Sequence, residues 1–191
     1  MVFLFLIAYW LYIDGVDTII RMAVDYGLSL GFNSADLITA LLITQFVGFP
    51  AALGFAYLAR YIGTKQGILL AIIVYLFITV SASRISDVSQ FYTLAVIIGL
   101  VQGGIQALSR SFYARIIPKN QSAEFFGFYN MLGKFAAIFG PVMMGLVSLS
   151  TQNPRLSILS VSILFVAGGI LLYFVNEAEA KDALQEYQAQ T

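Results

Sequence analysis

Four ionisable side chains interrupt an apolar stretch near the start of the chain. They are Asp14, Asp17, Arg21 and Asp25, within LYIDGVDTIIRMAVDYG at residues 11–27. Their spacing of three, four and four places them on one face of an α-helix. Carboxylates and a guanidinium on one helix face can bind a polar solute, exchange protons or form a structural ion pair. We call this set the charged stripe.

The composition indicates a membrane protein. The 191 residues are 60% hydrophobic and only 10% charged, whereas soluble domains contain about 45–50% apolar and about 25% charged residues. The ten basic and ten acidic residues balance, so no net charge points to nucleic acid as a partner. The sequence contains neither Cys nor His. This excludes disulfides and Cys/His metal sites, and we expect no metal and no cofactor.

Hydropathy predicts six membrane-spanning helices, because each span needs about 20 mostly apolar residues. The six segments lie at approximately 2–30, 35–59, 66–83, 90–113, 122–149 and 156–175. Their connections are too short to hold an extramembrane domain. We therefore predict an all-α polytopic membrane protein. Residues 1–176 are expected to form a six-helix bundle, and residues 177–191 a polar tail.

Basic residues near the span ends predict the orientation. One side carries Arg60, Lys65, Arg115 and Lys119, with Lys181 in the tail. The opposite side carries only Arg84 and Arg155. Because cytoplasmic loops are enriched in Lys and Arg, we expect the first side, with both termini, to be cytoplasmic. The membrane would be that of the cell or of a vacuole-type compartment.

Polar residues inside the spans recur with a period of three helices. Outside the charged stripe they are Gln45 in the second span, Gln102, Gln106 and Arg110 in the fourth, and Asn130 and Lys134 in the fifth. The third and sixth spans have no ionisable residue. This pattern predicts two three-helix repeats. The first and fourth helices would line a polar cavity, while the third and sixth face lipid.

The charged stripe must avoid lipid, since one charge at the bilayer centre costs about 2.5–3.5 kcal/mol. Arg21 can pair with Asp17 or Asp25, which leaves Asp14 as the candidate for a carboxylate without a partner. Such a group could bind and release a proton. The stripe thus predicts a solute or proton site, and the alternative is a structural ion pair that fixes helix packing.

The fourth and fifth spans offer neutral and basic partners for a solute. Gln102, Gln106 and Arg110 form one helix face, to which we also assign Ser109 and Tyr113. Amides suit a polar solute because they both donate and accept hydrogen bonds, although they equally suit interhelical bonding. Lys134, one turn after Asn130, would balance an aspartate or bind a solute carboxylate. Otherwise its side chain extends toward the membrane surface.

Three residues predict kinks or hinges within the spans. Pro50 lies in GFPAALG of the second span, and Gly140 precedes Pro141 in the fifth. Proline removes a backbone donor and crowds the preceding turn, so it bends helices. Both positions are therefore expected to be points where a span bends.

Three stretches resemble those of a known family. Residues 99–141, GLVQGGIQALSRSFYARIIPKNQSAEFFGFYNMLGKFAAIFGP, resemble the tenth and eleventh spans of major facilitator superfamily transporters. Residues 11–27 resemble the seventh span of the branch related to fungal autophagy-linked vacuolar amino-acid effluxers. LARYIGTK resembles the superfamily loop signature at Gly63 and Lys65, but Arg60 stands where the acidic residue belongs. That difference puts the usual gating salt bridge in doubt.

The resemblance implies twelve spans in two halves that work by alternating access. The chain would be the C-terminal half, with an N-terminal half or a second copy as its partner. It would move a small polar solute, such as an amino acid, with proton coupling through Asp14 or Asp17. The alternative is a scaffold that transports nothing. An intramembrane protease is disfavoured, because Asp14 and Asp17 share one helix and the chain has no His.

Overall fold

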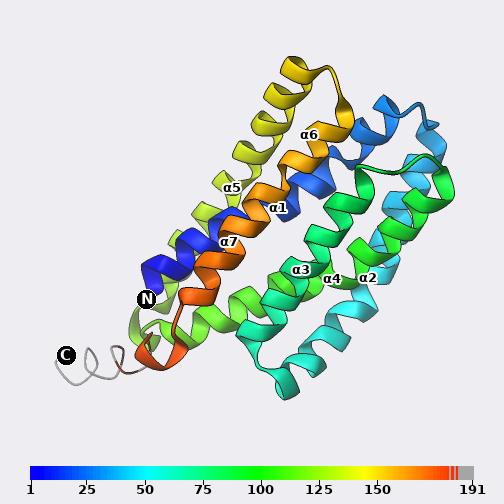
Figure 1. Ribbon diagram of the computed structural model, residues 1–191. Helices are drawn as coiled ribbons and strands as arrows, with labels where there is room; N and C mark the ends of the chain where they lie inside the picture. Colours follow the sequence, from blue (N-terminus) through cyan, green and yellow to red (C-terminus); the bar gives the residue numbers. More distant parts are fainter. Residues whose placement is uncertain (181, 183, 185–191) are drawn as a thin grey trace.

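The computed structural model describes residues 1–180, 182 and 184, and these fold into a bundle of α-helices (Figure 1). The helices are α1 (Val2–Ser29), α2 (Ser34–Ile62), α3 (Thr64–Ala82), α4 (Val88–Ile116), α5 (Ser122–Thr151), α6 (Pro154–Ser160) and α7 (Ser162–Phe174), with a short 3₁₀ turn at Lys119–Gln121. A large part of the predicted tail, with Lys181, lies outside the described residues.

The six predicted spans are confirmed to within a few residues at each end. Six helical segments of the described chain are long and apolar enough to cross a membrane. The sixth consists of α6 followed by α7, and these two helices meet at Val161. Hydropathy predicted the spans well because membrane helices need a nearly continuous apolar run.

Helix packing follows the predicted division into two repeats. In the first repeat (α1–α3) the middle helix, α2, packs chiefly against α4, and in the second (α4–α7) the middle helix, α5, packs chiefly against α1. Similarly, α3 packs against α4 while α7 packs against α1, and α3 and α7 touch each other. In Figure 1, α3 and α7 lie in front of α1 and α4, with α2 and α5 on the two flanks. The second and third helices of each repeat therefore pack on the first helix of the other repeat.

Local sequence explains where the helices stop. Gly63 separates α2 from α3 with φ +88°, a conformation that glycine adopts without strain. Before α6, the Asn153 side chain accepts a hydrogen bond from the Arg155 N–H at 3.0 Å, and Pro154 occupies the first helical position. Pro50 and Pro141 both lie inside continuous helices.

Aromatic rings from three helices fill the bundle core. Phe5 of α1 packs against Phe112 of α4 with ring centroids 4.8 Å apart, and Tyr9 stacks on Tyr129 of α5 at 4.1 Å. Tyr12 is fully buried, and its hydroxyl is 2.8 Å from Ser109 Oγ of α4. Because buried hydroxyls need a partner, this bond fixes α1 against α4.

Lys65 connects the start of α3 to the end of α7. Its Nζ donates to the carbonyl oxygens of Tyr173 at 2.8 Å and Val175 at 2.7 Å. The last carbonyls of a helix have no partner within that helix, and a cation is favoured there. The same end carries Met1, which lies beside Lys65 and Glu177. Met1 and the last turn of α7 therefore lie at the same end of the bundle.

We expect Lys65→Met to loosen the end of α7 without disturbing the bundle. A hydrogen bond to a charged group contributes about 1.5–3 kcal/mol, so amide exchange in the last turn of α7 should accelerate by about tenfold or more. Hydrogen exchange with mass spectrometry would measure this. Lys119→Met removes the same charge from the same end and should leave α7 unchanged. Equal protection in both variants would contradict the role given to Lys65.

Candidate functional site

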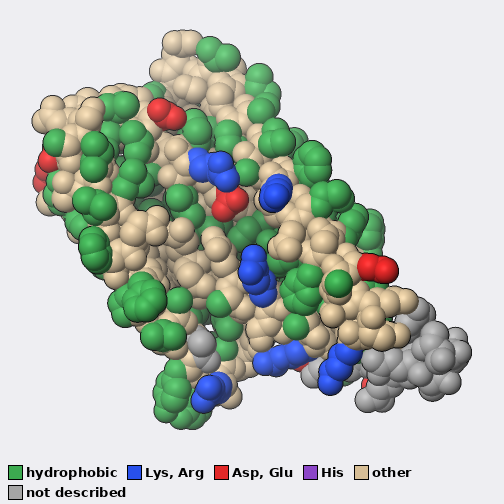
Figure 2. All heavy atoms as spheres, turned by 180° about the vertical axis from the view of Figure 1, so that it is seen from behind, with side chains coloured by type: hydrophobic (Ala, Val, Ile, Leu, Met, Phe, Trp, Pro, Cys, Tyr) green, Lys and Arg blue, Asp and Glu red, His purple; other side chains and the backbone are tan. Residues whose placement is uncertain are grey.

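Basic and acidic side chains occupy the face opposite α3 and α7 (Figure 2), and charged and amide residues of four spans are exposed or partly exposed. Figure 2 shows basic and acidic side chains in the middle of this face, surrounded by apolar ones. The exposed members are Arg21, Gln45, Gln106, Arg110, Asn130 and Lys134, and the partly buried members are Asp17 and Gln102. Several, such as Asp17 and Gln102, lie near the midpoints of their helices. We call this set the polar face.

Asp17 and Arg110 lie around one aromatic pair. Both act electrostatically on the Tyr9 hydroxyl, and Arg110 also acts on Tyr129. Tyr9 and Tyr129 stack with centroids 4.1 Å apart. A carboxylate from α1 and a guanidinium from α4 are therefore positioned near the same rigid ring pair. Opposite charges from two neighbouring helices can bind a molecule that carries both an amino and a carboxylate group.

The predicted ion pair within the charged stripe does not form. In the described part of the chain, the ion pair within 4 Å joins Arg115 to Glu177, at 3.9 Å. Arg21 acts on Asp17 electrostatically but is not within that distance. Arg21 and Asp25 are exposed, so both are available to another molecule or to water.

Asp14 differs from the rest of the stripe, and the expectation that it lacks a partner is wrong. Its side chain is only 2% exposed. Its two carboxylate oxygens accept from the Gly140 N–H at 3.1 and 3.0 Å, and one of them also accepts from Thr18 Oγ1 at 3.4 Å. Asp14 therefore binds the backbone of α5 just before Pro141 and is not exposed on the polar face.

The face predicted for α4 is only partly correct. Gln106 and Arg110 are exposed on the polar face, and Gln102 is partly exposed. Ser109 and Tyr113 are fully buried instead. Ser109 donates to the Ile105 carbonyl at 2.6 Å, and the Tyr113 hydroxyl donates to the Phe125 carbonyl at 3.2 Å. The Ser109–Ile105 bond lies within α4, whereas the Tyr12–Ser109 bond joins α4 to α1 and the Tyr113–Phe125 bond joins α4 to α5.

The three residues of the predicted loop signature have different structural roles. Arg60 is exposed at the end of α2. Gly63 forms the break between α2 and α3, and Lys65 binds the end of α7. All three thus lie at the end of the bundle that holds Met1, away from the middle of the polar face.

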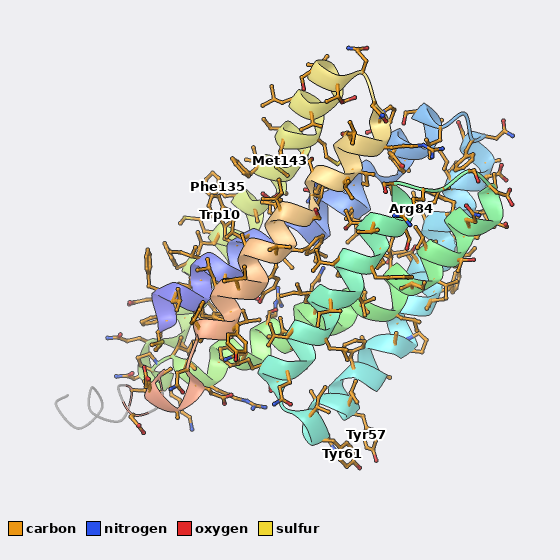
Figure 3. The ribbon with its side chains drawn as sticks, in the orientation of Figure 1. Trp10, Tyr57, Tyr61, Arg84, Phe135 and Met143 are labelled. Atoms are coloured by element: carbon orange, nitrogen blue, oxygen red, sulfur yellow. The ribbon has the colours of Figure 1, made fainter. Side chains whose placement is uncertain are left out.

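Sequence reasoning missed the aromatic residues of the first span. Tyr9 and Trp10 directly precede the stripe, and Trp10 is one helical turn before Asp14. Trp10 lies beside Phe139 of α5, with ring centroids 6.4 Å apart, and Figure 3 shows it on the same flank as Phe135 and Met143. Within the described structure its buried indole N–H has no acceptor. Because Trp10 lies four residues before Asp14, on the same helix face, this spacing could have placed it among the candidate site residues.

The fold and the polar face define a six-span integral membrane protein with polar groups at the depth of the bilayer centre. A family model described as "Vacuole effluxer Atg22 like" matches residues 1–185. The chain belongs to this family, and the resemblance to the vacuolar effluxer branch is confirmed.

Two relatives add detail. An uncharacterized MFS-type transporter, YxiO, of Bacillus subtilis (strain 168) is 41% identical over 184 residues, which cover 96% of this chain and 43% of that protein. Autophagy-related protein 22-2 of Aspergillus clavatus is 28% identical over 163 residues, covering 77% of this chain and 27% of that protein. The chain thus spans less than half the length of either relative.

Proposed function

We propose that the chain forms one half of a secondary transporter that moves a small polar solute by alternating access. The observation that carries this proposal is the polar face. Asp17, Arg110 and Lys134 come from three different helices and are at least partly exposed, and basic and acidic side chains gather on one side of the bundle (Figure 2). Intramembrane charges are costly in lipid, so such a face needs water, solute or protein against it.

The charges favour a zwitterionic solute, such as an amino acid. Asp17 offers an acceptor for an ammonium group, while Arg110 and Lys134 offer donors for a carboxylate. Gln102 and Gln106 add amide groups on the same helix as Arg110. The Tyr9–Tyr129 stack is buried in the bundle core and supports this part of the polar face from within.

A second half would cover the polar face. The greater length of these relatives supports a covalently linked half of similar size, and a second copy is the other arrangement. The flanking helices α2 and α5 are largely apolar and poorly buried, with Phe46 and Phe49 78% and 79% exposed. We propose that these two helices contact the other half, and that the end with Arg60, Lys65 and Lys119 faces the cytoplasm.

Proton coupling would run through Asp17. Its carboxylate accepts no hydrogen bond from the described residues, and it is partly exposed on the polar face. Asp14 is the less suitable carrier, because its oxygens already bind Gly140 and Thr18. A carboxylate that exchanges protons must reach the solute pathway.

Asp17→Asn in the full-length protein tests this role. We expect solute transport driven by a pH gradient in reconstituted vesicles to fall by about tenfold or more, since an amide cannot carry the proton. Exchange of solute without a gradient should persist at high solute concentration, because the Asn side chain still offers an oxygen to the ammonium group. Asp25→Asn, two turns further along the same stripe, should retain coupling. Unchanged pH-driven transport in Asp17→Asn would contradict the coupling role. Absence of both coupled transport and exchange in the wild-type protein would instead favour a scaffold.

A further inference from the structure

An open groove lies between α3 and α4 at the end of the bundle opposite Met1. It has a volume of about 380 Å³. Phe77 and Arg84 line it from the α3 side, and Gln90 and Ile97 line it from α4. Figure 3 shows Arg84 at the connection between these two helices.

The groove is polar at its outer end and apolar toward the membrane interior. Arg84 and Gln90 flank the connection between α3 and α4, whereas Phe77 and Ile97 each lie seven residues further into their helices. Seven residues of α-helix rise about 10 Å. The groove is therefore long enough to hold a lipid headgroup and the first part of an acyl chain.

Arg84 is the charged residue of the lining and has no counter-ion. Its exposed guanidinium has neither a carboxylate within 4 Å nor a hydrogen bond to any described residue. The nearby Arg155 is already engaged, because it donates to the Ile85 carbonyl at 3.0 Å.

Asp87, the closest acid in sequence, is also engaged. The Ser89 hydroxyl donates to its carboxylate at 2.7 Å, and this bond, with the backbone N–H groups of Ser89 and Val88, lowers the pKa of Asp87. Asp87 thus stabilises the start of α4 and leaves Arg84 unpaired.

The groove does not face the proposed solute pathway. Ile97 and Gln106 are nine residues apart on α4, which is two and a half turns, so they lie on opposite sides of that helix. Gln106 belongs to the polar face, and Phe77 is 61% exposed on the outer side of α3. The groove therefore opens toward the surrounding bilayer.

We propose that this groove binds a glycerophospholipid with an anionic headgroup, whose phosphate is held by Arg84 and whose acyl chain lies along Phe77, Leu94 and Ile97. A guanidinium binds a phosphate with two parallel hydrogen bonds, which an ammonium cannot do. Gln90 and Thr93 place polar atoms beside the headgroup. The site is separate from the polar face, so it stands or falls independently of the transport proposal.

Native mass spectrometry of the full-length protein in mild detergent tests the site. Phosphatidylglycerol added to delipidated protein should bind more tightly than phosphatidylcholine. Arg84→Gln should weaken phosphatidylglycerol binding by about tenfold, since a charge-assisted hydrogen bond is lost. Lys119→Gln removes the same charge at the opposite end and should bind as wild type does. Equal binding by Arg84→Gln and Lys119→Gln would overturn the proposal.

A second variant keeps the test decisive if Arg84→Gln folds poorly. Ile97→Trp retains Arg84 but fills the groove, and it should also reduce phosphatidylglycerol binding. Circular dichroism would show whether each variant keeps its helices. If excess inorganic phosphate displaces the lipid while Ile97→Trp binds normally, the site recognises a free anion and the assignment of a lipid is overturned.

Discussion

Gly140→Ala is expected to separate α1 from α5 and to destabilise the full-length protein strongly. A Cβ at position 140 would overlap Thr18 Oγ1 and lie 2.9 Å from Thr18 Cβ and 3.1 Å from Asp14 Oδ1. Both helices would have to move apart, which stretches the bonds from the Gly140 N–H to the Asp14 carboxylate. Overpacking alone costs about 1–3 kcal/mol. The lost hydrogen bonds add to that cost. Thermal or chemical unfolding in detergent would measure the loss.

Two comparisons make this prediction specific. Gly127 lies in the same helix with no atom within 4 Å of a Cβ, so Gly127→Ala should be neutral or slightly stabilising. Thr18→Gly removes the two closest atoms, so the double variant should be less destabilised than the sum of the single ones. Additive effects, or equal stability of Gly140→Ala and Gly127→Ala, would show that the contact between α1 and α5 does not depend on Gly140.

This contact assigns different roles to two residues that the sequence could not distinguish. Asp14 and Asp17 share a helix face in the sequence. Which of them meets α5 depends on Gly140, which is 126 residues away from Asp14. Periodicity reports only the face of a single helix, so it cannot identify a contact of this kind. The same reason explains why the face predicted for α4 grouped Ser109, which is buried, with Arg110, which is exposed.

The span boundaries and the repeat pattern were predictable because they depend on local composition. A span can be recognised from the length and composition of one segment, without knowledge of its contacts. The third and sixth spans, which lack ionisable groups, also lie on the same side of the bundle (Figure 1). The aromatic pair of Tyr9 and Tyr129 was not predictable, since tyrosine suits the core of a bundle as well as a binding site. Its position beside Asp17 and Arg110 became visible only in three dimensions.

Asp14 and Asp17 together connect the proposed solute pathway to the packing of the bundle. Asp17 is partly exposed on the polar face, and three residues earlier Asp14 binds the backbone of α5 just before Pro141. A proline within a helix leaves a carbonyl without its usual partner and permits bending there. Asp17 and Asp14 lie on the same turn of α1, and Asp14 holds α5 next to its predicted hinge. Solute or proton binding at Asp17 would therefore act on the part of α1 that contacts this hinge.

Truncation of exposed apolar residues should destabilise the protein when they lie on α2 and α5, and should have little effect on stability when they lie on α3 and α7. Leu53 of α2 and Leu146 of α5 are 68% and 63% exposed, and Ile73 of α3 and Ile163 of α7 are 62% and 63% exposed. If α2 and α5 contact the other half, each leucine is buried in the complete protein. Leu53→Ala with Leu146→Ala should then cost about 2 kcal/mol or more per site, because each leaves a cavity.

The matched pair, Ile73→Ala with Ile163→Ala, should cost little in a bilayer, since lipid chains replace the lost contacts and are as apolar as the side chain removed. Unfolding of the full-length protein in lipid nanodiscs would compare the two pairs, and transport should fall only in the α2/α5 pair. A larger loss in the α3/α7 pair would reverse the assignment and place the other half against that side. The polar face would then lie away from it, so the same measurement also decides whether the charges of α1 and α4 can line a pathway between two halves.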